Sequence, residues 1–141
     1  VGPVQGGGIA MRYQNPIRFQ PETNHLLRVP RPIDLVALQT TEGTILTART
    51  DADFQIEHIF VANVSGSAAT YTLHLVPASG SVSTANKVID AEAISANSSS
   101  VVFALKGMML QPGMTLRGLG SANDAINIGG WGYDFQGQYS S

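Results

Sequence analysis

The chain has 141 residues, of which 13% are charged, a formal net charge of −2 and no cysteine. This length fits one domain, and the absence of cysteine excludes disulfides, thiolate metal sites and a cysteine nucleophile. The charged share is about half of what soluble domains usually carry. Such a surface loses its water at low cost and favours packed assemblies, and no apolar run approaches the roughly 20 residues that span a membrane.

Residues 1–32 are predicted to form an extended arm. Five of the seven prolines lie here, and proline disfavours helices and central strands while it biases the preceding residue to extended backbone. Four arginines against one acid, Glu22, make the segment net +3, although charges this sparse make a weak, salt-screened field. The arm residues expected to dock on a partner are Arg12, Tyr13, Ile17, Arg18, Phe19, Leu26, Leu27, Arg28 and Arg31.

Strand and turn signals alternate from Ile33 onward, without a convincing helical period. The strand candidates are, in chain order, Ile33–Leu38, Thr44–Thr50, Phe54–Val64, Thr70–Val76, Val101–Leu105, Met108–Leu110, Met114–Leu119 and Ala125–Phe135. Residues 83–90 can hold one helical turn before a further short strand. About eight short strands with Gly, Ser and Pro turns predict an all-β fold, an antiparallel β-sandwich or jelly roll over residues 33–141.

The segment from Phe54 to Val76 is predicted to be a hairpin around the turn Ser65-Gly66-Ser67. Its first strand is apolar on both faces from Ile59 to Val64, whereas one face of an antiparallel sandwich normally meets water. A second cover, from the arm or from another subunit, and a central strand covered by its own loops explain this equally well. The residues expected at a subunit interface are Phe60, Val61, Val64, Trp131 and Tyr133.

The residues that could carry chemistry form no constellation. His25, His58 and His74 show no metal-binding spacing, even if the last two lie on paired strands. Asp51 and Asp53 resemble a solvated turn before a strand more than a catalytic or cation-binding pair, and Asp90 and Glu92 share that ambiguity. We expect no enzymatic activity, no metal, no cofactor and no small-molecule substrate.

Trp131 and Tyr133, in Gly129-Gly-Trp-Gly-Tyr-Asp134, lie at alternate positions of one expected strand and therefore face one way. They could form a platform for stacking sugars or bases, but a core or interface anchor is the favoured interpretation. The arm arginines are too sparse for the several phosphate contacts that nucleic-acid binding needs.

The segment Ile59–Pro77 resembles small β-sandwich structural proteins of tailed bacteriophages. In that pattern an asparagine closes a strand, a Ser-Gly-Ser turn follows, and the next strand alternates threonine with apolar residues, as here at Asn63, Ser65–Ser67 and Thr70–Val76. Later pieces match in order: Ala96–Ser99, Leu110–Leu116 and Ala125–Tyr133. The resemblance spans residues 54–135 and omits the arm.

The resemblance implies a β-sandwich on the virion, made in the host cytoplasm and placed on the capsid surface. Its first implication is a capsid decoration (cement) protein that associates into a homo-oligomer, often a trimer, and stabilises the shell by clamping the major capsid protein. A tail, baseplate or fibre protein is the alternative. A carbohydrate-binding module that uses Trp131 and Tyr133 is a further one. Neither nucleic acid nor membrane is an expected partner.

Overall fold

Extended backbone dominates the structure, a computed structural model that describes residues 26–137. Residues Arg28–Gln136 form one compact unit. The elements are, in chain order, β2 (Leu26–Ala37), β3 (Gly43–Thr47), β4 (Asp53–Asn63), β5 (Ala69–Val76), the 3-10 helix η3 (Thr84–Asn86), β6 (Lys87–Ile94), β7 (Ser98–Val101), the 3-10 helix η4 (Phe103–Leu105), β8 (Met109–Leu110), β9 (Thr115–Gly120) and β10 (Ile126–Gly137). The all-β prediction is therefore confirmed.

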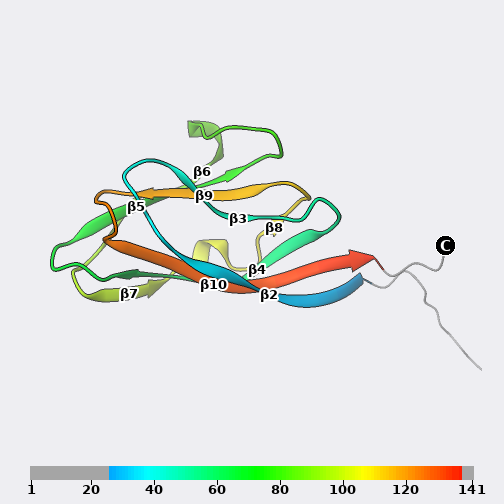
Figure 1. Cartoon of the computed structure of the whole chain (residues 1–141), viewed down its shortest axis with the longest axis horizontal. Helices are drawn as coiled ribbons and strands as arrows, with labels where there is room; N and C mark the ends of the chain where they lie inside the picture. The colour runs from blue at the N-terminus through cyan, green and yellow to red at the C-terminus, as the bar shows by residue number, and fades with distance from the viewer. Residues whose placement is uncertain (1–25, 138–141) are drawn as a thin grey trace, which may run out of the picture. The chain divides into compact units, whose positions relative to one another are not determined.

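The strands form two sheets that pack face to face (Figure 1). One sheet has the order β2-β10-β4-β7, with β8 also paired to β4, and the other has the order β3-β9-β5-β6. The registered pairs are antiparallel, and the chain crosses between the sheets after β2, β3, β4, β6, β8 and β9. Apart from the short strand β8, each sheet has four strands, and these two orders are the strand arrangement of a jelly roll.

The predicted hairpin from Phe54 to Val76 is wrong. β4 and β5 belong to different sheets, so the turn at residues 64–68 carries the chain from one layer to the other. β4 pairs with β10, β7 and β8, whereas β5 pairs with β6 and β9. A short polar turn between two strands fits a hairpin and a sheet-to-sheet crossing alike, and only the distant partners decide between them.

The boundary between the predicted arm and the body also shifts. Strand β2 begins at Leu26, so Pro30 and Pro32 lie within a strand and not in a separate arm. They are tolerated because β2 is an edge strand, where a missing N–H breaks no ladder on the free side. Whether residues 1–25 form an extended arm falls outside the described residues.

A β-bulge in β4 changes which residues face the interior. Trp131 of β10 pairs with His58, but the next residue, Gly132, pairs with Ile56, so Glu57 is the extra residue. The buried positions are Phe54 and Ile56 before the bulge, and odd-numbered residues from Ile59 onward. One strict alternation, as expected from the sequence, therefore assigns the second half of β4 to the wrong faces.

The core between the sheets is apolar and closely packed. Its fully buried side chains include Phe54, Ile59, Leu73, Leu116 and Ile128. On β5, Tyr71 and Leu73 face this core, and Thr70 and Thr72 face outward, as the alternating sequence predicts. The remaining buried hydrophobic residues come from both sheets and from η4, so a single core holds the unit together.

Candidate interaction surface

A row of aromatic and aliphatic side chains covers the outer side of the β2-β10-β4-β7 sheet. We define this aromatic face by Leu35 of β2, His58 and Phe60 of β4, and Trp131 and Tyr133 of β10. The ring centroids of Trp131 and Tyr133 lie 5.2 Å apart in an edge-to-face arrangement, and those of His58 and Phe60 lie 6.3 Å apart. Trp131 pairs directly with His58 across the ladder, which makes the patch continuous.

Glycines in β10 position these side chains. A Cβ on Gly130 would lie 1.9 Å from the backbone oxygen of His58, and one on Gly132 would lie 2.2 Å from that of Gln55. Only glycine therefore lets β10 lie against the bulge, with Trp131 between the two glycines directed outward. On the outer side, a Cβ on Gly129 would lie 3.1 Å from the side chain of Leu35, so Leu35 packs over the gap that Gly129 leaves.

The exposure of the face is unusual for a sandwich. Trp131 is 39% exposed and Leu35 is 61% exposed. The exposed large hydrophobic residues among those described come from β2, β8, β10, η4 and the adjoining turns, and none belongs to the β3-β9-β5-β6 sheet. The outer side of that second sheet, which we call the threonine-rich face, carries Thr44, Thr70, Thr72, Thr115 and Arg117. A contiguous aromatic patch on one side marks an interaction surface.

Charged groups of both signs border the aromatic face. The guanidinium of Arg28 lies 4.2 Å above the centroid of the Tyr133 ring, a cation–π contact. Lys106 forms an ion pair of 2.8 Å with Glu57, the extra residue of the bulge, and this hydrogen bond lowers the pKa of the Glu57 carboxyl. Neighbouring positive and negative groups thus give the face no dominant sign of charge.

The predicted interface residues lie in three different environments. Phe60, Trp131 and Tyr133 belong to the aromatic face, as their outward positions in β4 and β10 require. Val61 is fully buried in the core, so it offers no surface to a partner. Val64 is exposed at the turn that follows β4. Whether any of them contacts another subunit stays a prediction.

The predicted docking residues of the arm divide in the same way. Arg12, Tyr13, Ile17, Arg18 and Phe19 lie outside the described residues, and the side chain of Leu26 does too. Leu27 is exposed in β2, and Arg28 covers Tyr133. Arg31 serves the fold through its ion pair with Asp134.

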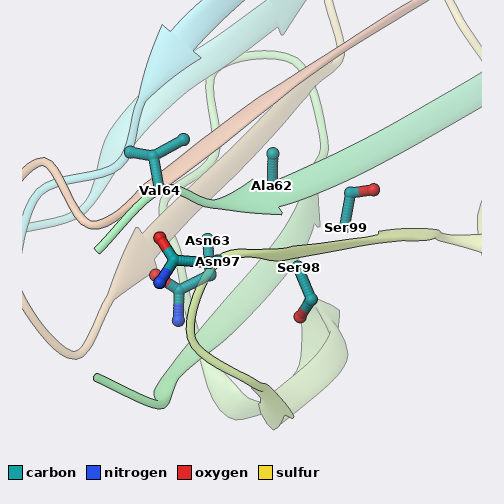
Figure 2. A pocket seen from close by; sticks show the side chains of 6 residues that line it. All are labelled: Ala62, Asn63, Val64, Asn97, Ser98 and Ser99. Carbon is teal, nitrogen blue, oxygen red and sulfur yellow. The ribbon is translucent and has the colours of Figure 1, made fainter. Parts of the chain in front are cut away.

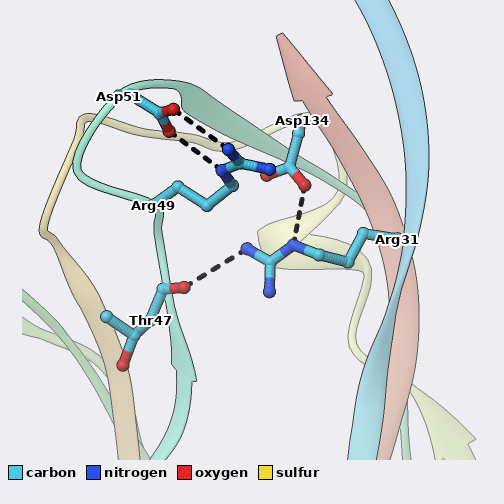
Figure 3. A network of polar contacts seen from close by, with 5 residues as sticks. All are labelled: Arg31, Thr47, Arg49, Asp51 and Asp134. Carbon is cyan, nitrogen blue, oxygen red and sulfur yellow. Dashed lines mark hydrogen bonds and ion pairs between the residues drawn. The ribbon is translucent and has the colours of Figure 1, made fainter. Parts of the chain in front are cut away.

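Arg31 points between the sheets and joins them (Figure 3). Its Nε donates to the carboxylate of Asp134 in β10 at 2.8 Å, and its Nη2 donates to the carbonyl oxygen of Thr47 in β3 at 3.2 Å. The guanidinium also lies 4.6 Å from the centroid of the Phe54 ring. Asp134 is buried, so this pair holds the edge strand β2 onto the sandwich and leaves Arg31 little freedom to bind elsewhere.

The hollow in Figure 2 is a by-product of a crossing between the sheets. It measures about 360 Å³ and is lined by Ala62, Asn63, Val64, Asn97, Ser98 and Ser99. The amide of buried Asn63 donates to the carbonyls of Ser67 and Ile94 and accepts from both the N–H and the hydroxyl of Ser65. All of its hydrogen-bonding capacity is used internally, so Asn63 fixes the crossing and is not free to bind a ligand.

The candidate chemical groups are dispersed over the two sheets. His58 and His74 lie on strands of different sheets, so the idea that they occupy paired strands is wrong. Asp51 pairs with Arg49 at 2.9 Å in an exposed turn, which lowers the pKa of Asp51. Within residues 26–137 no three His, Cys, Asp or Glu side chains cluster as metal ligands would. No helix in this part of the chain is long and apolar enough to cross a membrane.

Sequence reasoning missed several exposed apolar residues. Leu35 follows the buried Ile33 at the next position of the same expected face, so alternation predicts it to be buried. Phe103 is 74% exposed because η4 interrupts the strand expected over Val101–Leu105. The run Gly129-Gly130-Trp131-Gly132 was the one available signal for the bulge, since clustered glycines in a strand mark bulges and close backbone approach.

Comparison with known proteins adds a structural likeness alone. No protein-family model and no curated protein matches the sequence. A solved chain of Desmodium yellow mottle tymovirus is similar in structure, with a TM-score of 0.44 and 11% sequence identity, over 92% of this chain and 99% of that one. A likeness at this level carries no inference about what this chain does.

Proposed function

We propose that this chain is a structural protein of a virus particle that works by assembly, and that it decorates the capsid shell. The jelly-roll strand order is the observation that carries the proposal, because this topology is a common architecture of viral capsid proteins, shared with lectins and cupins. The sequence resemblance to phage structural proteins points to the same class independently. The aromatic face supplies what an assembly protein requires, an apolar surface ready to lose its water.

The geometry disfavours the sugar-binding alternative. Stacking on a sugar or base uses an open ring face, but the rings of Trp131 and Tyr133 meet at an interplanar angle of 75°. The guanidinium of Arg28 already covers Tyr133. A glycan array that shows binding by the intact chain, abolished by Trp131→Ala, would reinstate a carbohydrate-binding role.

In the proposed role, the body packs through its sheets while residues 1–25 reach toward the major capsid protein. Several weak contacts made together give high avidity without a single strong site. The homotrimer that the resemblance implies stays a prediction. A tail, baseplate or fibre location uses the same domain, and density for the chain at the tail of the particle would replace the decoration role by this one.

The decisive experiment measures binding of the chain to purified empty heads. Deletion of residues 1–25 stops before strand β2, so the sandwich keeps all its strands, and deletion of residues 138–141 serves as the matched control. We expect the first deletion to lower head binding at least tenfold and the second to leave it unchanged. Full head binding without residues 1–25 would refute the proposal that this segment clamps the major capsid protein. If the intact chain binds no part of the particle, the proposed role in the virion is refuted.

A further inference from the structure

The aromatic face is apolar and open to solvent, so contact with a partner would bury it. The edge strands of the two sheets, in contrast, are poorly suited to pairing with a strand of another chain. Pro30 and Pro32 remove two N–H donors from β2, while β7 and β8 have only four and two residues. In the second sheet, β3 contains a register irregularity and β6 contains two, with Ala91 at a φ of 49°. Short, proline-containing and bulged edges resist the addition of a strand from another chain.

The size of the aromatic side of the sheet fits one half of a specific interface. The three long strands β2, β10 and β4, about 4.8 Å apart and some eleven residues long, cover roughly 500 Å² in projection, and side-chain relief adds to this. One partner in a standard protein–protein interface contributes about 800 Å². Aromatic anchors such as Trp131 and Tyr133 are the residues that dominate the binding energy of such interfaces.

The charges around the face fit a second copy of the chain. Arg28 and Lys106 oppose Glu57 and Asp53 on or beside the outer side of this sheet, and the exposed Asp34 adjoins Leu35 in β2. A surface that carries both signs of charge neither strongly repels an identical one nor steers a strongly charged partner toward it. Two identical sheets also share the same twist, and sheets with matching twist pack face to face at about 30°.

The side chains of the face also suit a two-fold contact. Trp131 projects outward, and Leu35 packs over the gap that Gly129 leaves in the same strand. A two-fold axis places each patch against its own copy, so it can set the tryptophan of one chain against aromatic and aliphatic side chains of the other.

We infer that the aromatic face binds the same face of a second copy and forms a two-fold dimer. This inference rests on the proposed assembly role, but it is tested without any particle. A two-fold contact yields a dimer and not the trimer that the resemblance implies, so the mass in solution distinguishes them.

The experiment is sedimentation equilibrium of the full chain over a concentration series, paired with tryptophan fluorescence. Trp131 is the single tryptophan of the chain, so its emission reports on this face directly. We expect a reversible dimer whose formation shifts the emission to shorter wavelength. Leu35→Ser should raise the dimer dissociation constant roughly 30-fold, as the loss of an interface anchor does, and should abolish the shift.

Two matched variants locate the contact. Leu119→Ser removes an apolar side chain from the outer side of the other sheet, where Leu119 pairs with Thr72, and Phe103→Ser removes the exposed residue of η4. Both should dimerise as the unaltered chain does. Trp131→Gln should also be monomeric, and thermal unfolding of each variant verifies that it is folded.

Three results would overturn the inference: a monomer at every concentration, a trimer, or a dimer with unshifted emission or with an unchanged constant in Leu35→Ser. Head binding separates this failure from failure of the proposed function. If the chain stays monomeric and still binds heads, the dimer is refuted and the decoration role is supported. If the chain dimerises through this face and binds no part of the particle, the dimer is supported and the decoration role is refuted.

Discussion

The outer sides of the two sheets obey the same alternation and yet carry opposite surfaces. On β5 and β9 the outward positions include three threonines, Leu119 and Arg117, which forms an ion pair with Glu42. On β4 and β10 they include Phe60, Trp131 and Tyr133 beside smaller or polar residues such as Ala62 and Asn127. An antiparallel sandwich needs one apolar side per sheet for its core. The threonine-rich face is typical of the solvent-exposed side of such a sheet. Folding alone does not explain an aromatic outer side, so the aromatic face points to a function in binding.

Both sheets contain irregularities, but in different places. The aromatic face depends on a bulge at Glu57 in the central strand β4 and on the glycines opposite it. In the other sheet the irregularities lie in the edge strands β3 and β6, and the central strands β5 and β9 pair without a register shift. Bulges re-aim side chains and are frequent beside functional sites. The bulge here directs Phe60 outward and Val61 inward, which places an aromatic ring on the surface at the cost of a regular ladder.

The largest expected effect comes from Gly130→Ala. The added Cβ would lie 1.9 Å from the backbone oxygen of His58, at a φ of 157° that disfavours other residues. Because backbone on β4 must move, we expect a loss of at least about 4 kcal/mol in the free energy of unfolding, measured by urea denaturation.

Gly43→Ala on the other sheet is the matched control, since nothing lies within 4 Å of its added Cβ. It should change the free energy of unfolding by less than about 1 kcal/mol. Equal effects of the two substitutions would show that the glycines of β10 are not what supports the bulge.

Arg31→Ala is expected to have the next largest effect. It leaves the carboxylate of Asp134, whose side chain is 4% exposed, without its cation. Breaking a buried pair costs about 3–5 kcal/mol, and the partial exposure of Arg31 reduces this to roughly 2–3 kcal/mol. Asp134→Asn in the same chain should restore part of the loss, because it removes the uncompensated charge.

The threonine-rich face offers the comparison for this pair. Arg117 bonds to Glu42, whose side chain is 20% exposed and keeps more contact with water. Arg117→Ala should therefore cost no more than about 1 kcal/mol in the same denaturation measurement. A larger loss than that of Arg31→Ala would mean that the two sheets are held together elsewhere than at Asp134.

The fold was predictable from the sequence at the level of strands and turns. Thr70–Val76 alternates clearly, and its inward and outward residues were assigned correctly as far as Leu73. The partners of the strands were not predictable, because the turn at Ser65–Ser67 fits a hairpin as well as a crossing between sheets. Pro30 and Pro32 indicated an arm, although an edge strand tolerates proline equally well.

The candidate surface was predictable only in part. Trp131 and Tyr133 share a face because two residues on one regular strand segment must. Val61 was misassigned because the bulge in β4 reverses every later side chain of that strand. Leu35 was missed because it is exposed although Ile33, two residues earlier, is buried. Bulges depend on how two distant strands fit together, and local sequence contains little of that information beyond the clustered glycines.

Asn63→Ala tests the crossing between the sheets and should have an intermediate effect. It removes four hydrogen bonds and leaves the buried carbonyl of Ile94 without its donor. We expect a loss of about 2 kcal/mol in the free energy of unfolding. Asn127→Ala, at a half-buried outward position of β10, should lose less than about 0.5 kcal/mol. If the two losses are equal, Asn63 does not fix the crossing.

The smallest expected effect concerns Glu57 and depends on pH. Its hydrogen bond from Lys106 lowers the pKa of the carboxyl below its ordinary value of 4.5, so the folded state binds the proton more weakly than the unfolded state does. The stabilisation is therefore present above that ordinary value and is lost as the pH falls through the lowered pKa of the folded state. Since the side chains of Glu57 and Lys106 are 34% and 57% exposed, solvent screens the pair, and the contribution is small and sensitive to salt.

Glu57→Gln isolates this contribution at the border of the aromatic face. The urea midpoint of the variant should lie below that of the unaltered chain at pH 7, and the two should converge as the pH falls through the lowered pKa of the carboxyl in the folded state. Lys106→Met should reproduce the same convergence, because it removes the other half of the pair. A difference that does not shrink with falling pH would show that Glu57 acts through the geometry of the bulge, in which it is the extra residue, and not through its charge.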